Sequence, residues 1–413
     1  MAGLLTVLPS PPEDPGSGPS LELSEDLREF RETRKLAELL RLTREVLGDP
    51  GYPTARAWAR SGRGAVGCFP VYTPQEIVHA LGLLPVSLHG GGENIEISHA
   101  DAALGSFLCS ISKSTLELAL THRLDAFRAF AFPYICDVSR NLEGIFSRLL
   151  PGVPTHMLHL PQNFESAGSV AFLMTEYRRW TEKLEKVSGT RLTEEALRGS
   201  IEVFARQREL LAALAALRVE EPWQMDLSEH YLLRRLGGLL PRELHIELVT
   251  RALEEVRERK RKRRDAVRLL VVGPFCEQPT LDLIDLLEEV GFYVVGDEFL
   301  MLHSWYDRPP PAPSALEGLA RVYLETPRDL GVRRAPTYKG QALQERVRAA
   351  RAEAVLFLSA KFCEPALEDI VLYRRGLEKD RIPYLHLEFE ERSTAYEQTR
   401  LQLETFAESI LFE

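Results

Sequence analysis

The sequence predicts an α/β fold made of two similar doubly wound parallel-sheet domains that are joined by an α-helical bridging region. Short apolar runs alternate with helical patterns in both halves of the chain, and this alternation is typical of parallel β-α-β units. The halves also share an internal repeat: a strand pattern, a cysteine, a helix pattern, a proline and a second strand. In this repeat 23 residues separate Cys136 from His159, and the same number separates Cys363 from His386. Such a match indicates two domains of one architecture.

Two segments precede the first domain. Residues 1–20 are rich in proline, serine and glycine, which predicts a disordered tail. Residues 21–60 carry leucines at helical spacing among charged residues, so we expect N-terminal amphipathic helices there.

The first α/β domain is expected over residues 61–165. A short buried strand is predicted at 65–70, a continuous helical stretch at 101–120, and further strands at 126–132 and 157–160. Strands that alternate with helices pair in parallel, because a parallel pair needs a long crossover connection.

The bridging region is expected over residues 166–265 and is predicted to be all-helical. Long stretches of helical periodicity span residues 170–186, 192–217 and 243–264. The last stretch ends in an uninterrupted run of six Lys and Arg residues, which we interpret as the solvated cationic end of a helix.

The second α/β domain is expected over residues 266–413. Strands are predicted at 269–276, 354–359 and 384–387, and a short helix at 404–412 is expected to close the chain. The order of strands, helices and prolines follows that of the first domain.

Composition and charge exclude several classes of function. The chain has 413 residues, of which 45% are hydrophobic and 27% charged, so a large buried core is expected. The formal net charge of −10 argues against a nonspecific nucleic-acid binder, and no apolar run is long enough to span a membrane. With five cysteines and no secretory signal, the sequence predicts a cytoplasmic protein whose cysteines are free or bound to metal.

Three cysteines form the main candidate site. Cys136 and Cys363 each follow a predicted strand and precede a helix, which is where open α/β sheets bind ligands. The positive end of a helix dipole lowers the pKa of a thiol and favours the thiolate that binds metals. Cys109 can bring a third sulfur to the same crevice, and three thiolates can hold an iron–sulfur cube with one iron open. The alternative is that all the cysteines are small buried hydrophobic residues.

Other residues are candidates of a different kind. Cys68 and Cys276 fall on the first predicted strand of each half, where core packing is the favoured interpretation. Glu277 and Gln278 follow at that strand end and are candidates for an acid or a hydrogen-bond donor. The histidines of the repeat, of which His159 is the candidate proton donor, are interpreted first as core residues.

The sequence contains no convincing nucleotide-binding loop. Gly62-x-Gly64-x-x-Gly67 matches a dinucleotide fingerprint in form, but these glycines enter a strand instead of following it into a helix. A G-x-x-x-x-G-K-[ST] loop is absent, so this chain is not expected to hydrolyse ATP itself.

The motifs together resemble the 2-hydroxyacyl-CoA dehydratase and benzoyl-CoA reductase superfamily over about residues 60 to 413. The segments that carry this resemblance are 67–77 (GCFPVYTPQEI), 107–110 (FLCS), 132–137 (FPYICD) and 361–365 (KFCEP). Three further segments are more similar to the smaller cluster-binding subunit of ATP-dependent benzoyl-CoA reductases than to the dehydratases: 160–164 (LPQNF), 275–279 (FCEQP) and 404–412 (ETFAESILF).

The resemblance implies a site, a cofactor and partners. It implies that Cys109, Cys136 and Cys363 ligate a 4Fe-4S cluster, and that the chain pairs with a homologous cluster-binding subunit. Separate ATP-hydrolysing activator subunits, supplied by ferredoxin, would deliver electrons to an aromatic acyl-CoA. The implied reaction is a Birch-like reduction, in which two electrons and two protons convert the ring to a cyclohexadiene-carbonyl-CoA.

Two other functions stay open at this point. A 2-hydroxyacyl-CoA dehydratase subunit would use the same cluster as a Lewis acid and recover its electron in each turnover. A non-enzymatic scaffold would use the cysteines only for structure, with or without metal. A relative that binds a double-cubane cluster as a homodimer is a lesser alternative.

Overall fold

The computed structural model describes residues 25–274, 276–299, 308–325, 339–393 and 395–412. The predicted tail at residues 1–20 lies outside the described residues.

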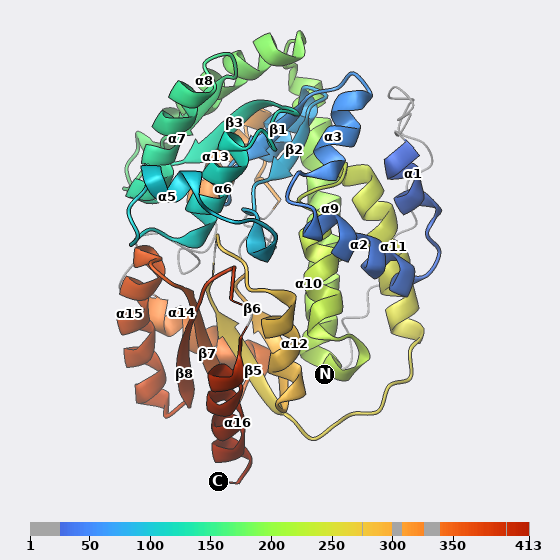
Figure 1. Cartoon of the computed structure of the whole chain (residues 1–413), viewed down its shortest axis with the longest axis vertical. Helices are drawn as coiled ribbons and strands as arrows, with labels where there is room; N and C mark the ends of the chain where they lie inside the picture. Colours follow the sequence, from blue (N-terminus) through green and yellow to red (C-terminus); the bar gives the residue numbers. More distant parts are fainter. Residues whose placement is uncertain (1–24, 275, 300–307, 326–338, 394, 413) are drawn as a thin grey trace.

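Two four-stranded sheets, all parallel, form the frame of the molecule and lie one above the other in Figure 1. The first has the order β2-β1-β3-β4 and the second the order β6-β5-β7-β8. The predicted fold class is therefore confirmed, and both halves have the same strand order. The strands of the first sheet are β1 (Ala65–Cys68), β2 (Leu84–Ser87), β3 (Phe127–Pro133) and β4 (Thr155–Leu158). Those of the second are β5 (Val267–Val272), β6 (Phe292–Asp297), β7 (Ala354–Ala360) and β8 (Tyr384–Phe389).

The bounds of β4 and β5 differ most from the predicted ones. β4 begins and ends two residues before the predicted strand at 157–160. β5 ends at Val272 rather than at residue 276, because Gly273 has a φ of +74° and Pro274 has no N–H with which to extend a ladder. The apolar run continues past the point where the strand stops.

Helices cover the sheets and fill the N-terminal segment. The predicted N-terminal helices are present as α1 (Glu25–Glu32), α2 (Leu36–Gly48) and α3 (Pro53–Arg60). Those of the first half are α4 (Gln75–Ala80), α5 (His99–Ala103), α6 (Ser110–Leu120) and α7 (Asp137–Leu149). Those of the second half are α12 (Leu281–Glu289), α13 (Ala315–Glu325), α14 (Lys339–Ala350), α15 (Glu364–Asp380) and α16 (Glu397–Leu411).

The continuous helix predicted at residues 101–120 is wrong. α5 stops at Ala103, a loop follows, and α6 begins at Ser110. Gly105 lies in this loop and weakens helix propagation there. The carboxylate of Glu117 on α6 accepts the N–H of Ala100 at 2.7 Å, and this bond folds α5 back onto α6.

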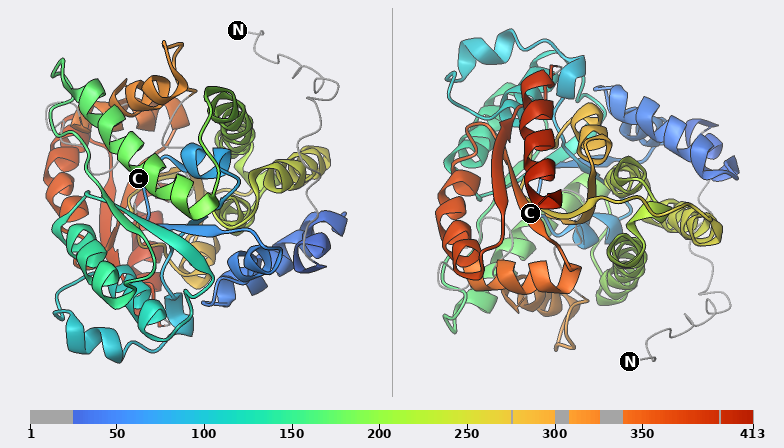
Figure 2. Two further views of the ribbon diagram at one scale, coloured as in Figure 1. Left: turned by 90° about the horizontal axis from the view of Figure 1, so that it is seen from above. Right: turned by 90° about the horizontal axis from the view of Figure 1, so that it is seen from below.

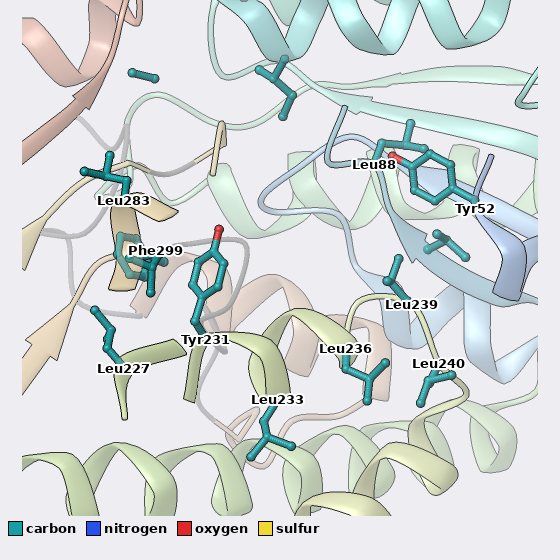
Figure 3. Packing of buried hydrophobic residues seen from close by; sticks show 14 of the residues in the cluster. Tyr52, Leu88, Leu227, Tyr231, Leu233, Leu236, Leu239, Leu240, Leu283 and Phe299 are labelled. Carbon is teal, nitrogen blue, oxygen red and sulfur yellow. The ribbon is translucent and has the colours of Figure 1, made fainter. Parts of the chain in front are cut away.

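The bridging region contains α8 (Ser169–Ser188), α9 (Glu194–Glu220), α10 (Leu227–Leu236) and α11 (Arg242–Glu258). The sequence patterns predict α8, α9 and α11 but not α10. Figure 3 shows Leu239, just beyond α10, near Tyr52, while Leu227 at the start of α10 lies near Phe299. The views in Figure 2 place the N-terminal helices beside these bridging helices. One hydrophobic core therefore joins the N-terminal helices, the bridging helices and both sheets. The division of the chain into domains at residues 165 and 265 stays a prediction.

The cationic run after α11 does not form the end of a helix, so that prediction is wrong. α11 ends at Glu258, and residues 259–264 form the extended connection to β5 that is visible at the bottom of Figure 1. Arg259 pairs with Glu229 at 2.8 Å, and the guanidinium of Arg263 lies 5.8 Å from the ring centroid of Trp223. These contacts fasten the connection to the bridging region instead of completing a helix dipole. Among the described helices, none is both long and apolar enough to cross a membrane.

Candidate functional site

The candidate site lies where the loops after the central strands of both halves meet. In each sheet the two central strands, β1 with β3 and β5 with β7, are neighbours whose connections lead to different sides. Such a switch point leaves a crevice beyond the carboxyl ends of the strands, where ligands of open α/β sheets bind. The identical order of the two sheets gives the molecule two switch points.

A cavity of about 390 Å³ opens at this place and is lined by residues of both halves. Its wall contains Cys109 and Cys136 from the first half and Cys276 and Cys363 from the second. The rest of the lining is largely apolar and includes Phe69 beyond β1. The structure thus brings the three predicted cysteines together and adds a fourth.

Each of the three predicted cysteines stands directly before a helix. Cys136 is the N-cap of α7, and its Sγ accepts the N–H of Ser139 at 3.4 Å. Cys363 is the N-cap of α15, and both cysteines come three residues after the end of a strand, β3 or β7. Cys109 is the N-cap of α6, because the predicted helix through it is broken. All three sulfurs therefore sit at helix starts.

Cys276 is the residue that sequence reasoning placed wrongly. Because β5 ends at Val272, Cys276 comes four residues after the strand and lines the cavity instead of packing inside the sheet. The signal was Pro274, which ends the ladder and gives Cys276 almost the same offset from its strand as Cys136 has from β3. Cys68, in contrast, is buried at the end of β1 with its Sγ 3.7 Å from the carbonyl of Val66, in agreement with core packing.

Burial dominates the electrostatics of the four thiols. It raises the pKa of Cys109 to about 12, and it also raises the pKa of Cys136, Cys276 and Cys363. The backbone N–H of Ser139 lowers the pKa of Cys136, but burial outweighs this effect. The expected lowering by the helix start is therefore present at Cys136, but the expected net decrease in pKa is wrong. A buried group of this kind becomes a thiolate when a metal cation supplies positive charge.

The donor set fits an iron–sulfur cluster better than a single ion. Within the described parts of the chain, no three His, Cys, Asp or Glu side chains converge closely enough to hold one metal ion. In a 4Fe-4S cube each thiolate binds a different iron, so the sulfurs are spread around the cluster. Several cysteines spaced around one apolar cavity match that requirement.

Glu277, next to Cys276, forms hydrogen bonds to residues of both halves. Its Oε2 accepts the N–H of Ile111 at 3.1 Å, and its Oε1 accepts the N–H of Glu391 at 2.8 Å. Ile111 is the second residue of α6, so this carboxyl caps the helix that begins after Cys109. Burial first, and then the charge of Glu391, raises the pKa of Glu277 well above its ordinary value.

The candidate acids of the sequence analysis do not line the cavity. Glu277 is occupied by backbone N–H groups, and Gln278 donates its Nε2 hydrogen to the carbonyl of Cys276 at 3.3 Å. The ring of His159 packs edge-on against Tyr134, with 6.1 Å between the ring centroids. The interpretation of both repeat histidines as core residues is wrong for His386, which is exposed on β8.

Two carboxylates that sequence reasoning missed do line the cavity. Asp137 and Glu364 are the first residues of α7 and α15, directly after Cys136 and Cys363. Both also line a second, more polar cavity of about 410 Å³, to which Gln162 contributes. Their matching positions in the internal repeat were the available signal.

The fold and the site define the class of protein. The chain belongs to the family described as 2-hydroxyglutaryl-CoA dehydratase, D-component, whose family model matches residues 70–410. This match confirms, at the level of the family, the resemblance seen in the sequence motifs.

Several characterised relatives align over nearly the whole chain. It is 34% identical to a benzoyl-CoA reductase subunit of Thauera aromatica, over 91% of this chain and 98% of that protein. It is 26% identical to the (R)-phenyllactyl-CoA dehydratase beta subunit of Clostridium sporogenes, over 89% of this chain and 97% of that protein. The beta subunit of lactoyl-CoA dehydratase from Anaerotignum propionicum is also 26% identical, over 91% of this chain and 100% of that protein. Each relative is named as one subunit of a larger enzyme.

Proposed function

We propose that the chain is the iron–sulfur subunit of an ATP-dependent benzoyl-CoA reductase, in which Cys109, Cys136 and Cys363 hold a 4Fe-4S cluster. The observation that carries this proposal is the meeting of these cysteines, from both halves of the chain, in one apolar cavity. The higher identity to a benzoyl-CoA reductase subunit than to the dehydratase subunits favours the reductase.

The residues of this chain hold the site and keep it dry. The cluster, when bound, supplies one-electron transfer at low potential. The three cysteines provide thiolate ligands, and the apolar wall with Phe69 and Leu142 keeps water from the site. A dry site strengthens electrostatic interactions and protects a reduced, reactive substrate from side reactions.

The proposed reaction balances with two electrons and two protons. Benzoyl-CoA takes up one electron into the thioester-conjugated ring and then a proton, and a second electron and proton give a cyclohexadiene-carbonyl-CoA. The electrons come from ferredoxin through ATP-hydrolysing activator subunits, which is consistent with the absence of a P-loop motif from this sequence. We place this assembly in the cytoplasm.

A homologous cluster-binding subunit is the proposed direct partner. Phe107 and Phe362 line the cavity and are 69% and 39% exposed, so an apolar rim surrounds its mouth. Exposed aromatic residues next to a site are typical of surfaces that a partner covers. The names of the relatives, each a subunit, support the same assembly.

The second candidate function is that of a 2-hydroxyacyl-CoA dehydratase subunit. The description of the matching family and the relatives at 26% identity favour it. The same cysteines would serve that reaction, so the cavity alone does not separate the two functions.

The test begins with metal analysis of the full chain, purified without oxygen together with its co-expressed partner subunits. About four irons and four acid-labile sulfides for each cluster-binding chain are expected. The complex is then assayed with benzoyl-CoA and with 2-hydroxyacyl-CoA, each with ATP and reductant. Turnover of benzoyl-CoA supports the reductase, and turnover of only the hydroxyacyl-CoA supports the dehydratase. Folded protein without iron would leave the scaffold function.

A further inference from the structure

We propose that Cys276 is a fourth thiolate ligand, so that this chain surrounds its cluster with two cysteines from each half. This inference rests on the proposed function and deepens it, because the resemblance implies only Cys109, Cys136 and Cys363 as ligands. The fourth cysteine was found in the structure, where it shares the cavity with the other three.

The internal repeat shows why Cys276 has no counterpart in the first half. Eight residues connect β5 to α12, whereas six connect β1 to α4. The first-half loop contributes Phe69 to the cavity wall, and the longer second-half loop contributes Cys276. The first half instead provides Cys109 from the start of α6. Each half thus supplies two cysteines. One follows the third strand of that half, as Cys136 and Cys363 do, and the other is Cys109 in the first half and Cys276 in the second.

The loop that carries Cys276 is held in place from three sides. The neighbouring Glu277 bonds to the start of α6 and to the loop after β8. Gln278 bonds back to the carbonyl of Cys276, and the hydroxyl of Tyr231 on α10 donates to the carbonyl of Pro279 at 2.7 Å. A loop fixed by this many buried hydrogen bonds holds its cysteine at a defined place on the cavity wall.

The thiol of Cys276 packs against the hydrophobic core but has no hydrogen-bond partner among the described residues. The Sγ of Cys136, in contrast, accepts an N–H, and that of Cys109 donates to Ser112 at 3.4 Å. Cys68, the cysteine on the first strand of the other half, is fully packed in the core. Cys276 is instead partly exposed and lines the cavity.

A fourth thiolate has a chemical consequence that can be measured. Four cysteines complete the ligand set of a 4Fe-4S cluster, and three leave one iron with an exchangeable ligand. An iron without a protein ligand is the one lost on mild oxidation, which leaves a 3Fe-4S cluster. The wild-type chain is therefore expected to keep all its irons, and a variant without the Cys276 thiol is expected to lose one.

The experiment uses the anaerobically purified complex of the full chain with its partner subunits. Wild type, Cys276→Ala and Cys276→Ser are titrated with ferricyanide, and iron content and the EPR signal of the 3Fe-4S form are recorded. Cys68→Ala is the matched control, because it removes a buried cysteine that does not line the cavity. The partner's own cluster contributes equally to all four samples, so the differences report this chain.

The expected result is an additional 3Fe-4S signal of about one spin per complex, and the loss of about one further iron, in Cys276→Ala relative to wild type and Cys68→Ala. Retention of part of the fourth iron in Cys276→Ser would agree with ligation at this position. If wild type forms the 3Fe-4S signal as readily as Cys276→Ala, Cys276 is not a ligand, and the proposed function is untouched. A wild-type complex in which this chain holds no iron would overturn both proposals. Where Cys276→Ala fails to fold, Cys276→Ser provides the comparison with wild type.

Discussion

The substitution Glu277→Gln tests whether the contact between the two halves positions Cys109. Glu277 accepts one N–H from the start of α6 and one from the loop after β8, at 3.1 and 2.8 Å. Glutamine has nearly the same shape but only one acceptor oxygen. Its amide NH₂ group must then face one of the two N–H donors, which loses its partner inside the protein.

The magnitude follows from these two bonds. One buried N–H donor left without an acceptor costs about 1–3 kcal/mol. The substitution also removes the repulsion between the carboxyl groups of Glu277 and Glu391, which offsets part of this cost. A net loss of about 1–2 kcal/mol is expected. If this loss opens the start of α6, the open population rises by about 5–30-fold.

The assay measures stability and local opening on the same metal-free chain. Urea unfolding gives the change in stability, and the alkylation rate of Cys109, followed by peptide mass spectrometry, reports the opening of α6. Glu288→Gln is the matched control, because Glu288 likewise accepts a helix-start N–H, that of Leu227 at 2.7 Å, but among the described residues it forms no hydrogen bond with α6. The other oxygen of Glu288 accepts from buried Arg218, so the amide NH₂ of glutamine must face one of two donors here as well, and the loss of stability is expected to be at least as large.

The expected outcome is faster alkylation of Cys109 by about 5–30-fold in Glu277→Gln, and an unchanged rate in Glu288→Gln. An equal rate at Cys109 in both variants, despite lost stability, would refute the positioning role of Glu277. Unchanged stability of Glu277→Gln, within about 0.5 kcal/mol, would show that the two hydrogen bonds contribute nothing measurable.

Two further predictions concern the first half. His156 stacks on Trp180, and burial lowers its pKa to about 3. As the pH falls below about 6.5, the imidazole therefore becomes protonated in the unfolded chain but stays neutral in the folded one. Stability attributable to His156 is full above that pH and falls by about 2 kcal/mol by pH 5, and His156→Phe should remove this part of the pH dependence in urea unfolding. Gly90 has a φ of +72°, and an added Cβ would lie 2.4 Å from Oγ of Ser114. Gly90→Ala should therefore cost more than about 2 kcal/mol, whereas Gly92→Ala, with a φ of +57° and open space, should cost about 1 kcal/mol in the same thermal unfolding measurement. Equal costs would show that movement of Ser114 and Glu391, which the added Cβ also approaches, relieves the clash.

The fold was largely predictable because buried parallel strands are continuous apolar runs that the sequence displays directly. The repeat then predicted that Cys136 and Cys363 take equivalent positions after such strands, and the structure places both at helix starts on one cavity. Both inferences depend on local patterns and on the comparison of the chain with itself.

The features that the sequence did not predict depend on where strands and helices end and on contacts between residues far apart in the sequence. The apolar run after β5 hid the strand end at Val272, and so Cys276 was assigned to the core. Nothing local marks Glu277 as the cap of α6, because its partner Ile111 is 166 residues away in the sequence. Hydrogen bonds of this range follow from the docking of the halves and leave no periodic signal.

The docking of the halves is in turn set by the bridging region. Midway along α10, the hydroxyl of Tyr231 donates to the carbonyl of Pro279 in the loop that carries Cys276. Just beyond the C-terminal end of α10, the carbonyl of Gly238 accepts the N–H of Ser87 on β2 at 2.8 Å. The segment from Tyr231 to Gly238 therefore connects the edge strand of the first sheet to the loop that carries Cys276. Because cysteines of both halves line this cavity, the spacing of the proposed ligands depends on a helix that contributes no residue to the cavity lining.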